Sequence, residues 1–411
     1  MIRRPVILLA AAALTLSCAA KAPLSREIVR SEMARNPEAS YIDGLQGKLK
    51  WNYTTGLELK AMLDVYKRSF ADAQDDKESS SCHSERSEES IVAYVDAWYD
   101  AIIDSTGRIG VNYKKSNWST DHICPGRTLL SLCDLTGKEK YRKAMDSLYV
   151  QLQGQPRTPE GGFWHKKIYP GQMWLDGLYM AQPFYAEYTA RYVTDPSERE
   201  RNFEDIALQF SLAWDHCYDP STGLLRHAWD SSRQMFWADP STGQSAHAWG
   251  RACGWYAMAL LEVIPHFPEG ELRQGLIDKL NTLCVNIMNY ADPATGMWYQ
   301  VLDRPGEEGN WLESTASAMF TYALLKGCRM GWIKDIDIRL ARSKYRSLLE
   351  TFVTSDADGL VNLNDCCEVA GLGGKENRSG TYDYYIHEKV RSNDPKGIGP
   401  LVWAALEYER K

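Results

Sequence analysis

The sequence lacks the signatures of several common enzyme and binding classes. It has no Gly-x-Ser-x-Gly elbow, Walker loop, dinucleotide-binding fingerprint or His-Glu-x-x-His pair, so nucleophilic chemistry at Ser or Cys is not indicated. It has no Lys/Arg-rich run and a net charge of −7, which makes nucleic acid an unexpected partner. None of its ten cysteines has Cys-x-x-Cys spacing, so we expect no zinc site, no disulfide framework and no cofactor.

Long apolar runs are also missing, apart from one at the N-terminus. Arg3 and Arg4 precede an apolar segment, 6–16, that is too short to span a bilayer. Thr15-Leu16-Ser17-Cys18 is similar to a bacterial lipobox, which predicts a signal peptide over 1–18 and a lipidated Cys18. The alternative is a simple secretion signal. Both interpretations predict export, to the periplasm or as a lipoprotein anchored in the outer membrane of a Gram-negative bacterium.

The rest of the chain shows helical periodicity and almost no strand-like alternation. Paired helical patterns are separated by recurring turns with glycine at Gly56, Gly107, Gly162, Gly223, Gly296 and Gly359. Each glycine is expected to supply a positive φ. Six such helical hairpins predict an all-α fold, an (α/α)6 barrel, with an open solenoid of helix pairs as the alternative.

The domain plan that follows from these patterns has three parts. Residues 1–18 are the signal peptide, residues 19–45 a leader or linker, and residues 46–411 a single (α/α)6 catalytic domain. Within that domain, residues 72–89 are rich in Ser and acidic residues, a composition that predicts a disordered insertion between two paired helices.

One acid stands out in the segment from Gln172 to Met180. Asp176 lies in an apolar and aromatic stretch with helical spacing, where burial should raise the pKa of its carboxyl. A raised pKa suits a general acid working near neutral pH. The alternative is that Asp176 caps a helix, since Asp is favoured at that position.

Other candidate residues have structural explanations of similar weight. Asp121 and Glu313 each precede a predicted helix, where a cap is the simpler interpretation. His165 and Lys166 follow a Gly-Gly turn close to Asp176 and suit an anionic sugar, although both could be solvated loop residues. Arg251, with Trp249 beside it, could bind a carboxylate through two parallel hydrogen bonds or could cap a loop.

A series of short motifs, taken in order, resembles glycoside hydrolase family 105. The motifs are Trp51-x-Tyr53, Asp121-His122, Trp164-His165-Lys166, Met173-Trp174-Leu175-Asp176-Gly177, His227-Ala228-Trp229-Asp230, Trp249-Gly250-Arg251, Leu312-Glu313-Ser314-Thr315-Ala316-Ser317-Ala318 and Gly397-Ile398-Gly399-Pro400. The resemblance runs from about Trp51 to the C-terminus except for the insertion. The sequence departs from the family pattern at Cys253, where a small or polar residue is more usual.

The resemblance implies an (α/α)6 barrel and an activity. Family members are unsaturated rhamnogalacturonyl and related uronyl hydrolases, which remove a 4,5-unsaturated uronic acid from the non-reducing end of lyase-generated oligosaccharides. The family's general acid matches Asp176 and its second acid matches Asp121. Positions that line its substrate pocket match His165, Lys166, Trp174, Met180, His227, Trp249 and Arg251. Alternative functions are an unsaturated glucuronyl hydrolase acting on glycosaminoglycan or ulvan fragments, and a non-catalytic sugar-binding lipoprotein.

Overall fold

The structure, a computed structural model, describes residues 22–75 and 82–410. In this part of the chain the α-helices are α1 (Leu24–Arg35), α2 (Tyr53–Asp75), α3 (Cys82–Ile102), α4 (Gly126–Thr136), α5 (Glu139–Gln153), α6 (Leu175–Tyr192), α7 (Pro196–Cys217), α8 (Gly250–Val263), α9 (Glu271–Met288), α10 (Ser314–Arg329), α11 (Ile338–Phe352), α12 (Tyr382–Ile386) and α13 (Pro395–Tyr408). No helix among them is both long enough and apolar enough to cross a membrane.

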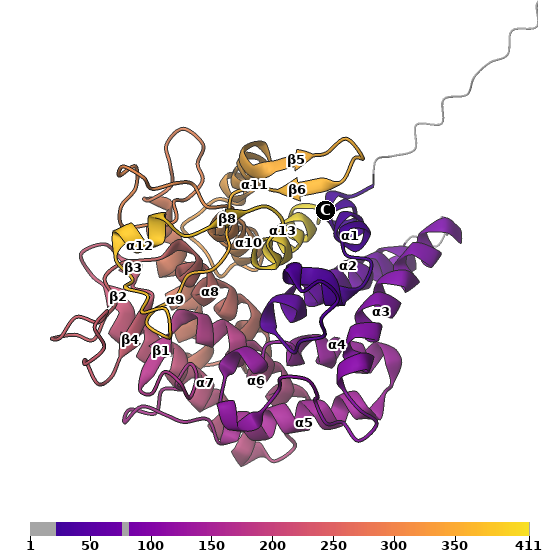
Figure 1. The fold of residues 1–411 in the computed structure, drawn as a ribbon, viewed down its shortest axis with the longest axis horizontal. Helices are drawn as coiled ribbons and strands as arrows, with labels where there is room; N and C mark the ends of the chain where they lie inside the picture. Colours follow the sequence, from indigo (N-terminus) through magenta and orange to yellow (C-terminus); the bar gives the residue numbers. More distant parts are fainter. Residues whose placement is uncertain (1–21, 76–81, 411) are drawn as a thin grey trace, which may run out of the picture.

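The helices form two concentric rings. The inner ring consists of α2, α4, α6, α8, α10 and α13, each packed against the next, and α13 packs back against α2. The outer helices α1, α3, α5, α7, α9 and α11 each cover neighbouring inner helices. Figure 1 shows the yellow C-terminal helix α13 beside the indigo helices α1 and α2, where the ring closes. The predicted (α/α)6 barrel is therefore confirmed, and the open solenoid is excluded by the contact between α13 and α2.

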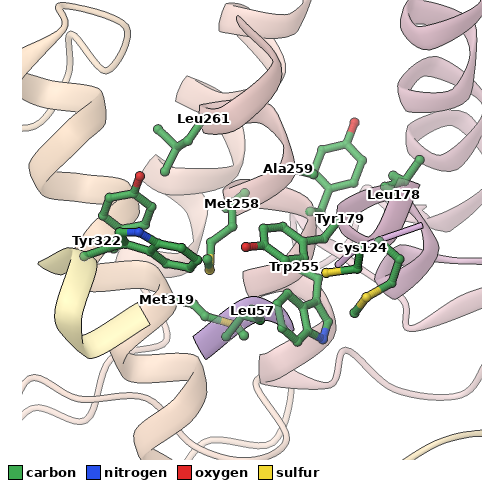
Figure 2. Packing of buried hydrophobic residues seen from close by; sticks show 14 of the residues in the cluster. Leu57, Cys124, Leu178, Tyr179, Trp255, Met258, Ala259, Leu261, Met319 and Tyr322 are labelled. Atoms are coloured by element: carbon green, nitrogen blue, oxygen red, sulfur yellow. The ribbon is translucent and has the colours of Figure 1, made fainter. Parts of the chain in front are cut away.

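Apolar side chains of the inner ring fill its centre. Figure 2 shows Leu57 from α2, Tyr179 from α6, Trp255 from α8 and Met319 from α10 converging on one another. The Tyr179 and Trp255 ring centroids are 4.6 Å apart. The centre of the barrel is therefore a filled apolar core.

Short strands in the loops supplement the helices. Among the described residues, four two-stranded antiparallel sheets pair β1 (Gln172–Trp174) with β4 (Ala228–Asp230), β2 (Tyr218–Asp219) with β3 (Leu224–Leu225), β5 (Val353–Ser355) with β6 (Val361–Leu363), and β7 (Cys366–Cys367) with β8 (Val390–Arg391). The sheet of β1 and β4 matters most here, because it joins two loops that carry candidate site residues.

The structure corrects the predicted domain plan at the leader. Residues 24–35 form helix α1, which packs on α13 and α2. Ile28 and Val29 are buried, and the hydroxyl and backbone N–H of Ser25 donate to the Glu409 carboxylate at 2.6 and 2.9 Å. The helix escaped prediction because it has few apolar residues, all on one face. The predicted signal segment 1–18 lies outside the described residues.

The predicted insertion also differs from the structure where the structure describes it. Residues 72–75 continue α2 and residues 82–89 belong to α3, while 76–81 lie outside the described residues. Helices α2 and α3 continue into this part of the chain because its Ala, Gln, Glu and Arg residues are good helix formers. The expectation of disorder is therefore wrong for the residues on either side of 76–81.

The recurring glycine turns are only partly as predicted. Gly107, Gly223, Gly296 and Gly359 have positive φ, between 73° and 87°. Gly161, with a φ of 96°, takes that role in place of Gly162. Gly56 lies inside α2, where an added Cβ would come within 2.8 Å of the Cα of Pro125. Close helix packing, and not turn geometry, therefore requires glycine at Gly56.

Candidate active site

Asp176 is held against His227 by the sheet of β1 and β4. Trp174 ends β1 and pairs with Ala228 of β4, and the backbone N–H of Leu175 donates to the His227 carbonyl at 3.1 Å. This pairing places Asp176 in the first turn of α6, with its Oδ2 3.2 Å from Nε2 of His227. The N-cap of α6 is Trp174, so the alternative that Asp176 caps the helix is wrong.

The expectation of a raised pKa for Asp176 is corrected. Burial acts to raise the pKa, but the hydrogen bond and charge of His227, with further contributions from His165 and Arg251, hold the Asp176 pKa below its usual value. The side chain is 16% exposed, so it can still reach a bound molecule. The sequence showed the apolar surroundings but not the basic groups that the fold brings to the carboxylate.

His227 is itself fixed from the opposite side. Its Nδ1 lies 2.7 Å from the hydroxyl of Tyr385 on α12, and both side chains are fully buried. Burial raises the pKa of Tyr385 well above its usual range, so this hydroxyl keeps its proton. Because the Tyr385 hydroxyl donates to Nδ1, the one proton of the neutral imidazole lies on Nε2. This N–H donates a hydrogen bond to the Asp176 carboxylate. Tyr385 therefore selects one tautomer of His227.

A second carboxylate, Asp121, lies in a separate polar group. It belongs to a short 3-10 helix (Thr120–His122), and its Oδ2 is 2.5 Å from Nζ of Lys166. Nε2 of His165 is 3.7 Å from Oδ1. The helix that follows, α4, has Pro125 at its N-cap, so the alternative of a cap is also wrong for Asp121.

The charges of this group shift one another's protonation. Burial acts to raise the pKa of Asp121, but the charge and hydrogen bond of Lys166, together with His165 and His122, outweigh it, so the Asp121 pKa is lowered. Burial and the Lys166 charge lower the pKa of His165 to about 4, which leaves His165 neutral near pH 7. The site thus has two ionised carboxylates in the unliganded protein.

Aromatic rings connect the two carboxylate groups. The Trp174 ring stacks on His165 with 4.8 Å between centroids, and Tyr169 stacks on Trp174, also at 4.8 Å. The edge of Trp174 meets His227 at 5.4 Å. Apolar ring faces flanked by charged groups suit a sugar ring that carries a carboxylate.

Trp249 and Arg251 complete the arrangement on the far side of His227. The Trp249 ring is 4.7 Å from His227, and the Arg251 guanidinium lies 4.5 Å over the Trp249 ring. Arg251 donates to the Cys367 carbonyl and is 2% exposed. Met180, one turn beyond Asp176 on α6, is 1% exposed and belongs to the hydrophobic core. The structure therefore joins all the predicted site residues except Met180 through successive contacts.

Glu313 has the structural role expected of it. It is the N-cap of α10, and its carboxylate accepts the backbone N–H groups of Ala316 at 2.5 Å and Cys367 at 2.9 Å. Burial raises its pKa. These bonds attach the loop around Cys367 to α10, and that loop carries the carbonyl that binds Arg251.

A cavity of about 640 Å³ opens beside Asp121 and Lys166, and Asp176 is not among the residues that line it. Its walls include Tyr53, Asp121 and Lys166, and further cationic residues: Lys50, Lys167, Arg391 and Lys396. Burial and then the charges of Asp121 and Asp176 raise the pKa of Tyr53. The charges of both carboxylates therefore affect the pKa of Tyr53, a residue of the cavity wall. No group of three or more His, Cys, Asp or Glu among the described residues is arranged to hold a metal ion.

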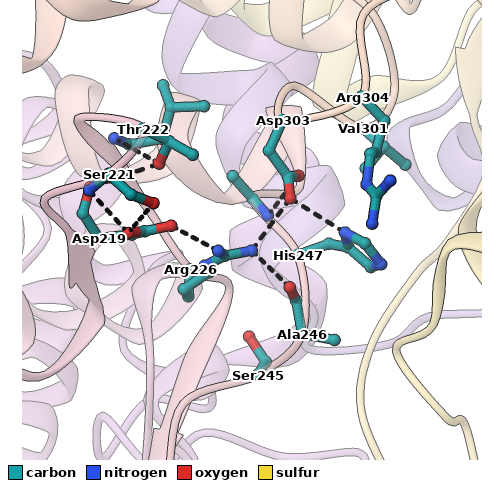
Figure 3. A network of polar contacts seen from close by, with 12 residues as sticks. Asp219, Ser221, Thr222, Arg226, Ser245, Ala246, His247, Val301, Asp303 and Arg304 are labelled. Atoms are coloured by element: carbon teal, nitrogen blue, oxygen red, sulfur yellow. Dashed lines mark hydrogen bonds and ion pairs between the residues drawn. The ribbon is translucent and has the colours of Figure 1, made fainter. Parts of the chain in front are cut away.

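An ion-pair network supports the loop that carries His227. Figure 3 shows Arg226 between the carboxylates of Asp219 and Asp303, with His247 bound to Asp303 at 3.0 Å. The His227 backbone N–H donates to the carbonyl of His247 at 3.2 Å. The network therefore fixes the backbone on both sides of His227, the residue that contacts Asp176.

Residues 24–411 match the model of Glycosyl Hydrolase Family 88. The chain belongs to this family. A glycoside hydrolase of family 105 from Clostridium acetobutylicum ATCC 824 has a similar structure, with a TM-score of 0.84 and 39% identity over 94% of this chain and 99% of that chain. The resemblance to family 105 read from the motifs is thereby confirmed. The protein is a glycoside hydrolase, and its substrate is an oligosaccharide.

Two curated relatives and one more distant structure extend the comparison. A 24.9 kDa protein in the picA locus of Rhizobium radiobacter is 39% identical over 56% of this chain and 97% of its own length. The unsaturated rhamnogalacturonyl hydrolase YesR of Bacillus subtilis is 30% identical over 52% of this chain and 59% of its own length. An unsaturated glucuronyl hydrolase from Bacillus sp. GL1, 12% identical over 94% of this chain and 95% of that chain with a TM-score of 0.62, shares the fold.

Sequence reasoning missed two residues of the site. Tyr53 stood inside a recognised motif, and only its place in the cavity wall shows its importance. Tyr385 lies 158 residues from His227 in the chain and belongs to no motif, so no sequence signal pointed to it.

Proposed function

We infer that the protein removes a 4,5-unsaturated uronic acid from the non-reducing end of oligosaccharides that polysaccharide lyases produce. Unsaturated galacturonyl-rhamnose from rhamnogalacturonan is the proposed substrate, supported by the activity for which the Bacillus subtilis relative is named. The observation that carries the proposal is the partly exposed carboxylate of Asp176, whose Oδ2 lies 3.2 Å from Nε2 of His227. The site around it is rich in aromatic and cationic side chains.

The proposed reaction begins with protonation of a carbon atom. Asp176 donates a proton to C4 of the unsaturated ring, and positive charge develops at C5, where the ring oxygen shares it. The Asp176 carboxylate then accepts a proton from water as the water oxygen bonds to C5. The resulting hemiketal opens by breaking the bond between C5 and the ring oxygen, and the hemiacetal left at C1 releases the neighbouring sugar. One carboxylate serves as acid and then as base.

The lowered pKa of Asp176 requires an explanation in this mechanism. The substrate carries its own carboxylate, and a like charge brought near Asp176 raises the pKa of Asp176. The substrate thus assists the protonation that its own hydration requires. His227 binds Oδ2, which leaves Oδ1 to carry the proton toward C4.

Asp121 and Lys166 have a different proposed role. Asp121 stays ionised beside Lys166 and can stabilise positive charge that develops on the sugar ring. Arg251 and Lys166 are the candidate partners of the uronate carboxylate, because both are cationic: Arg251 lies over the Trp249 ring, and Lys166 pairs with Asp121.

Ultraviolet absorbance tests the proposal directly. The conjugated double bond of the substrate absorbs, and hydration destroys it, so absorbance should fall with the wild-type protein and persist with Asp176→Asn. A panel of pectin, ulvan and glycosaminoglycan lyase products identifies the preferred uronide. Preference for a glucuronide would favour an unsaturated glucuronyl hydrolase. Unchanged absorbance with every product would contradict a hydrolase and favour a non-catalytic sugar-binding protein.

We also propose that the protein is exported and anchored through Cys18. The support is the sequence of residues 1–18, which lie outside the described residues. Incorporation of labelled palmitate into the wild-type protein, and its loss in Cys18→Ala, would support the anchor. Secretion without a label in either protein would support a simple signal peptide.

A further inference from the structure

The cavity of about 640 Å³ that Asp121 and Lys166 line is called the catalytic cavity below. A second cavity lies across the loop of residues 110–118 from it. It measures about 520 Å³ and lies between the turn at Gly107, the segment that follows this turn and helix α5. Four cationic side chains line it, from Arg108, Lys114, Lys115 and Lys143, and no Asp or Glu does. In a chain with a net charge of −7, such a local excess of positive charge is notable. These four residues are called the cationic groove below.

Most of these charges are not neutralised within the protein. Lys143 forms an exposed pair with Glu139 at 3.0 Å. For Arg108, Lys114 and Lys115, the described residues provide no ion-pair partner within 4.0 Å. The neighbouring acid, Asp104, accepts hydrogen bonds from the backbone of its own turn at Thr106 and Arg108. An anionic ligand could therefore bind Arg108, Lys114 and Lys115 without breaking an ion pair.

The loop of residues 110–118 separates the two cavities and borders both. Asn112 and Asn117 line the catalytic cavity. Tyr113, Lys114 and Lys115 line the cationic groove. A chain leaving the catalytic cavity over this loop would therefore reach the groove directly.

This loop is held in a strained conformation by bonds to the catalytic side. Val111 has a φ of 59°, which is rare for a β-branched residue, and Trp118 has a φ of 43°. The Asn112 side chain accepts from the Trp51 N–H at 2.7 Å and donates to the Trp51 carbonyl at 3.0 Å. Such strain persists only where surrounding bonds impose it, so the loop is fixed with its lysines turned away from the first cavity.

A further bond joins the loop to the catalytic residues. The backbone N–H of Lys167 donates to the Asn117 carbonyl at 3.2 Å, and Lys167 follows Lys166 in sequence. The catalytic cavity also has exposed lysines, Lys50 and Lys167, on this side. Cations thus continue from the catalytic cavity, across the loop, into the groove.

We propose that the cationic groove is a distal subsite that binds a uronate carboxylate of the same oligosaccharide whose non-reducing end lies against Asp176. This inference rests on the proposed function, because it takes the substrate to be an oligosaccharide that carries further uronate carboxylates beyond its unsaturated end. In the groove wall the Thr106 hydroxyl donates to Asp104 at 2.6 Å and the Ser147 hydroxyl donates to the Lys143 carbonyl at 3.1 Å, so each oxygen can still accept from a sugar hydroxyl. The subsite would give longer lyase products an advantage over disaccharides.

Chain-length kinetics test the subsite. Unsaturated disaccharide and hexasaccharide, prepared with a lyase from the same polymer, are compared for the wild-type protein and Lys114→Ala/Lys115→Ala. The double variant should raise KM for the hexasaccharide by about 3- to 10-fold at low salt, the range for two exposed ionic contacts. KM for the disaccharide and kcat for both should not change. Lys114→Arg/Lys115→Arg should restore the wild-type KM.

The matched control is Lys334→Ala/Arg346→Ala, which removes two exposed cations on or near helix α11. It should leave both substrates unaffected. An equal effect of the two double variants, or equal effects of Lys114→Ala/Lys115→Ala on disaccharide and hexasaccharide, would overturn the subsite. So would an unchanged KM for the hexasaccharide in that variant.

Binding without turnover separates this inference from the proposed function. Isothermal titration of a saturated oligogalacturonate hexamer, which has no double bond to hydrate, should show weaker binding to Lys114→Ala/Lys115→Ala than to wild type. Neutral maltohexaose should not distinguish them. Absence of disaccharide hydrolysis would refute the function alone, whereas equal hexamer affinity in both proteins would refute the subsite alone.

Discussion

The hydroxyl of Tyr385 lies 2.7 Å from Nδ1 of His227, in full burial. Because the opposite nitrogen of His227 lies 3.2 Å from Asp176, the tyrosine acts on the carboxylate through the imidazole. Tyr385 is thus a positioning residue, whose effect on the reaction depends on the tautomer that it imposes.

Replacing Tyr385 with Phe should lower kcat by about 3- to 10-fold, the effect of losing one buried hydrogen bond of ~1 kcal/mol. The pH profile should shift as well, because a histidine without a fixed tautomer donates less consistently to Asp176. A purely structural role would lower stability without moving the pH profile.

Tyr256→Phe is the matched control for that variant. Tyr256 is also fully buried and donates one hydrogen bond, to the Phe210 carbonyl at 3.0 Å. It lies in α8 among core residues, so its loss should reduce stability and leave the pH profile unchanged. The same pH shift in both variants would contradict the role assigned to Tyr385.

Lys166→Met should raise the pKa values of both Asp121 and His165. The Lys166 charge lowers both pKa values. Without it, the upward effect of burial on the Asp121 pKa meets less opposition, and the His165 pKa loses one of the two main effects that lower it. NMR titration of the His165 ring should therefore show a midpoint above the wild-type value of about 4. An unchanged midpoint would show that Lys166 does not control this group.

Stability should fall as the pH rises through the neutral range. Burial raises the pKa of Glu32 to about 7 and that of Glu58 well above its usual value. The folded protein therefore holds protons that the unfolded chain releases near pH 4.5, so unfolding becomes easier as the pH increases above that value. Stability from these two groups is fully present below about pH 4.5 and is lost through pH 7 and beyond.

Glu58→Gln isolates this effect. The neutral amide cannot ionise, so the variant should melt at a higher temperature than wild type at pH 8 and at a similar temperature near pH 4.5. Thermal unfolding at the two pH values provides the measurement. A melting temperature that is lowered equally at both would indicate that Glu58 contributes only packing.

The helices of the barrel were predictable because their apolar spacing is regular. Helices such as α6 and α11 lie between the glycine turns, as the paired helical patterns predict. The sequence did not predict helix α1, because only the side of this helix that carries Ile28 and Val29 faces the core. Local periodicity thus detects helices that bury a broad face and overlooks those that bury a narrow one.

The identities of the site residues were predictable from the sequence, but the electrostatic interactions between them were not. Asp176 was identified from its surroundings and from the family resemblance, yet its pKa shifts opposite to the expectation. The cause is His227, 51 residues away in the chain, which the pairing of β1 with β4 brings into contact. Charge interactions of this kind depend on tertiary contacts that no local pattern encodes.

The central claim is that Asp176 delivers a proton to C4 of the unsaturated ring, and hydrolysis in heavy water tests it most directly. The product formed by the wild-type protein in D2O should carry one deuterium at C4, detected by NMR, and Asp176→Asn should form product at least about 10²-fold more slowly. Release of the neighbouring sugar with the double bond intact and no deuterium at C4 would contradict the account, because the bond cleaved would then be the ordinary glycosidic one.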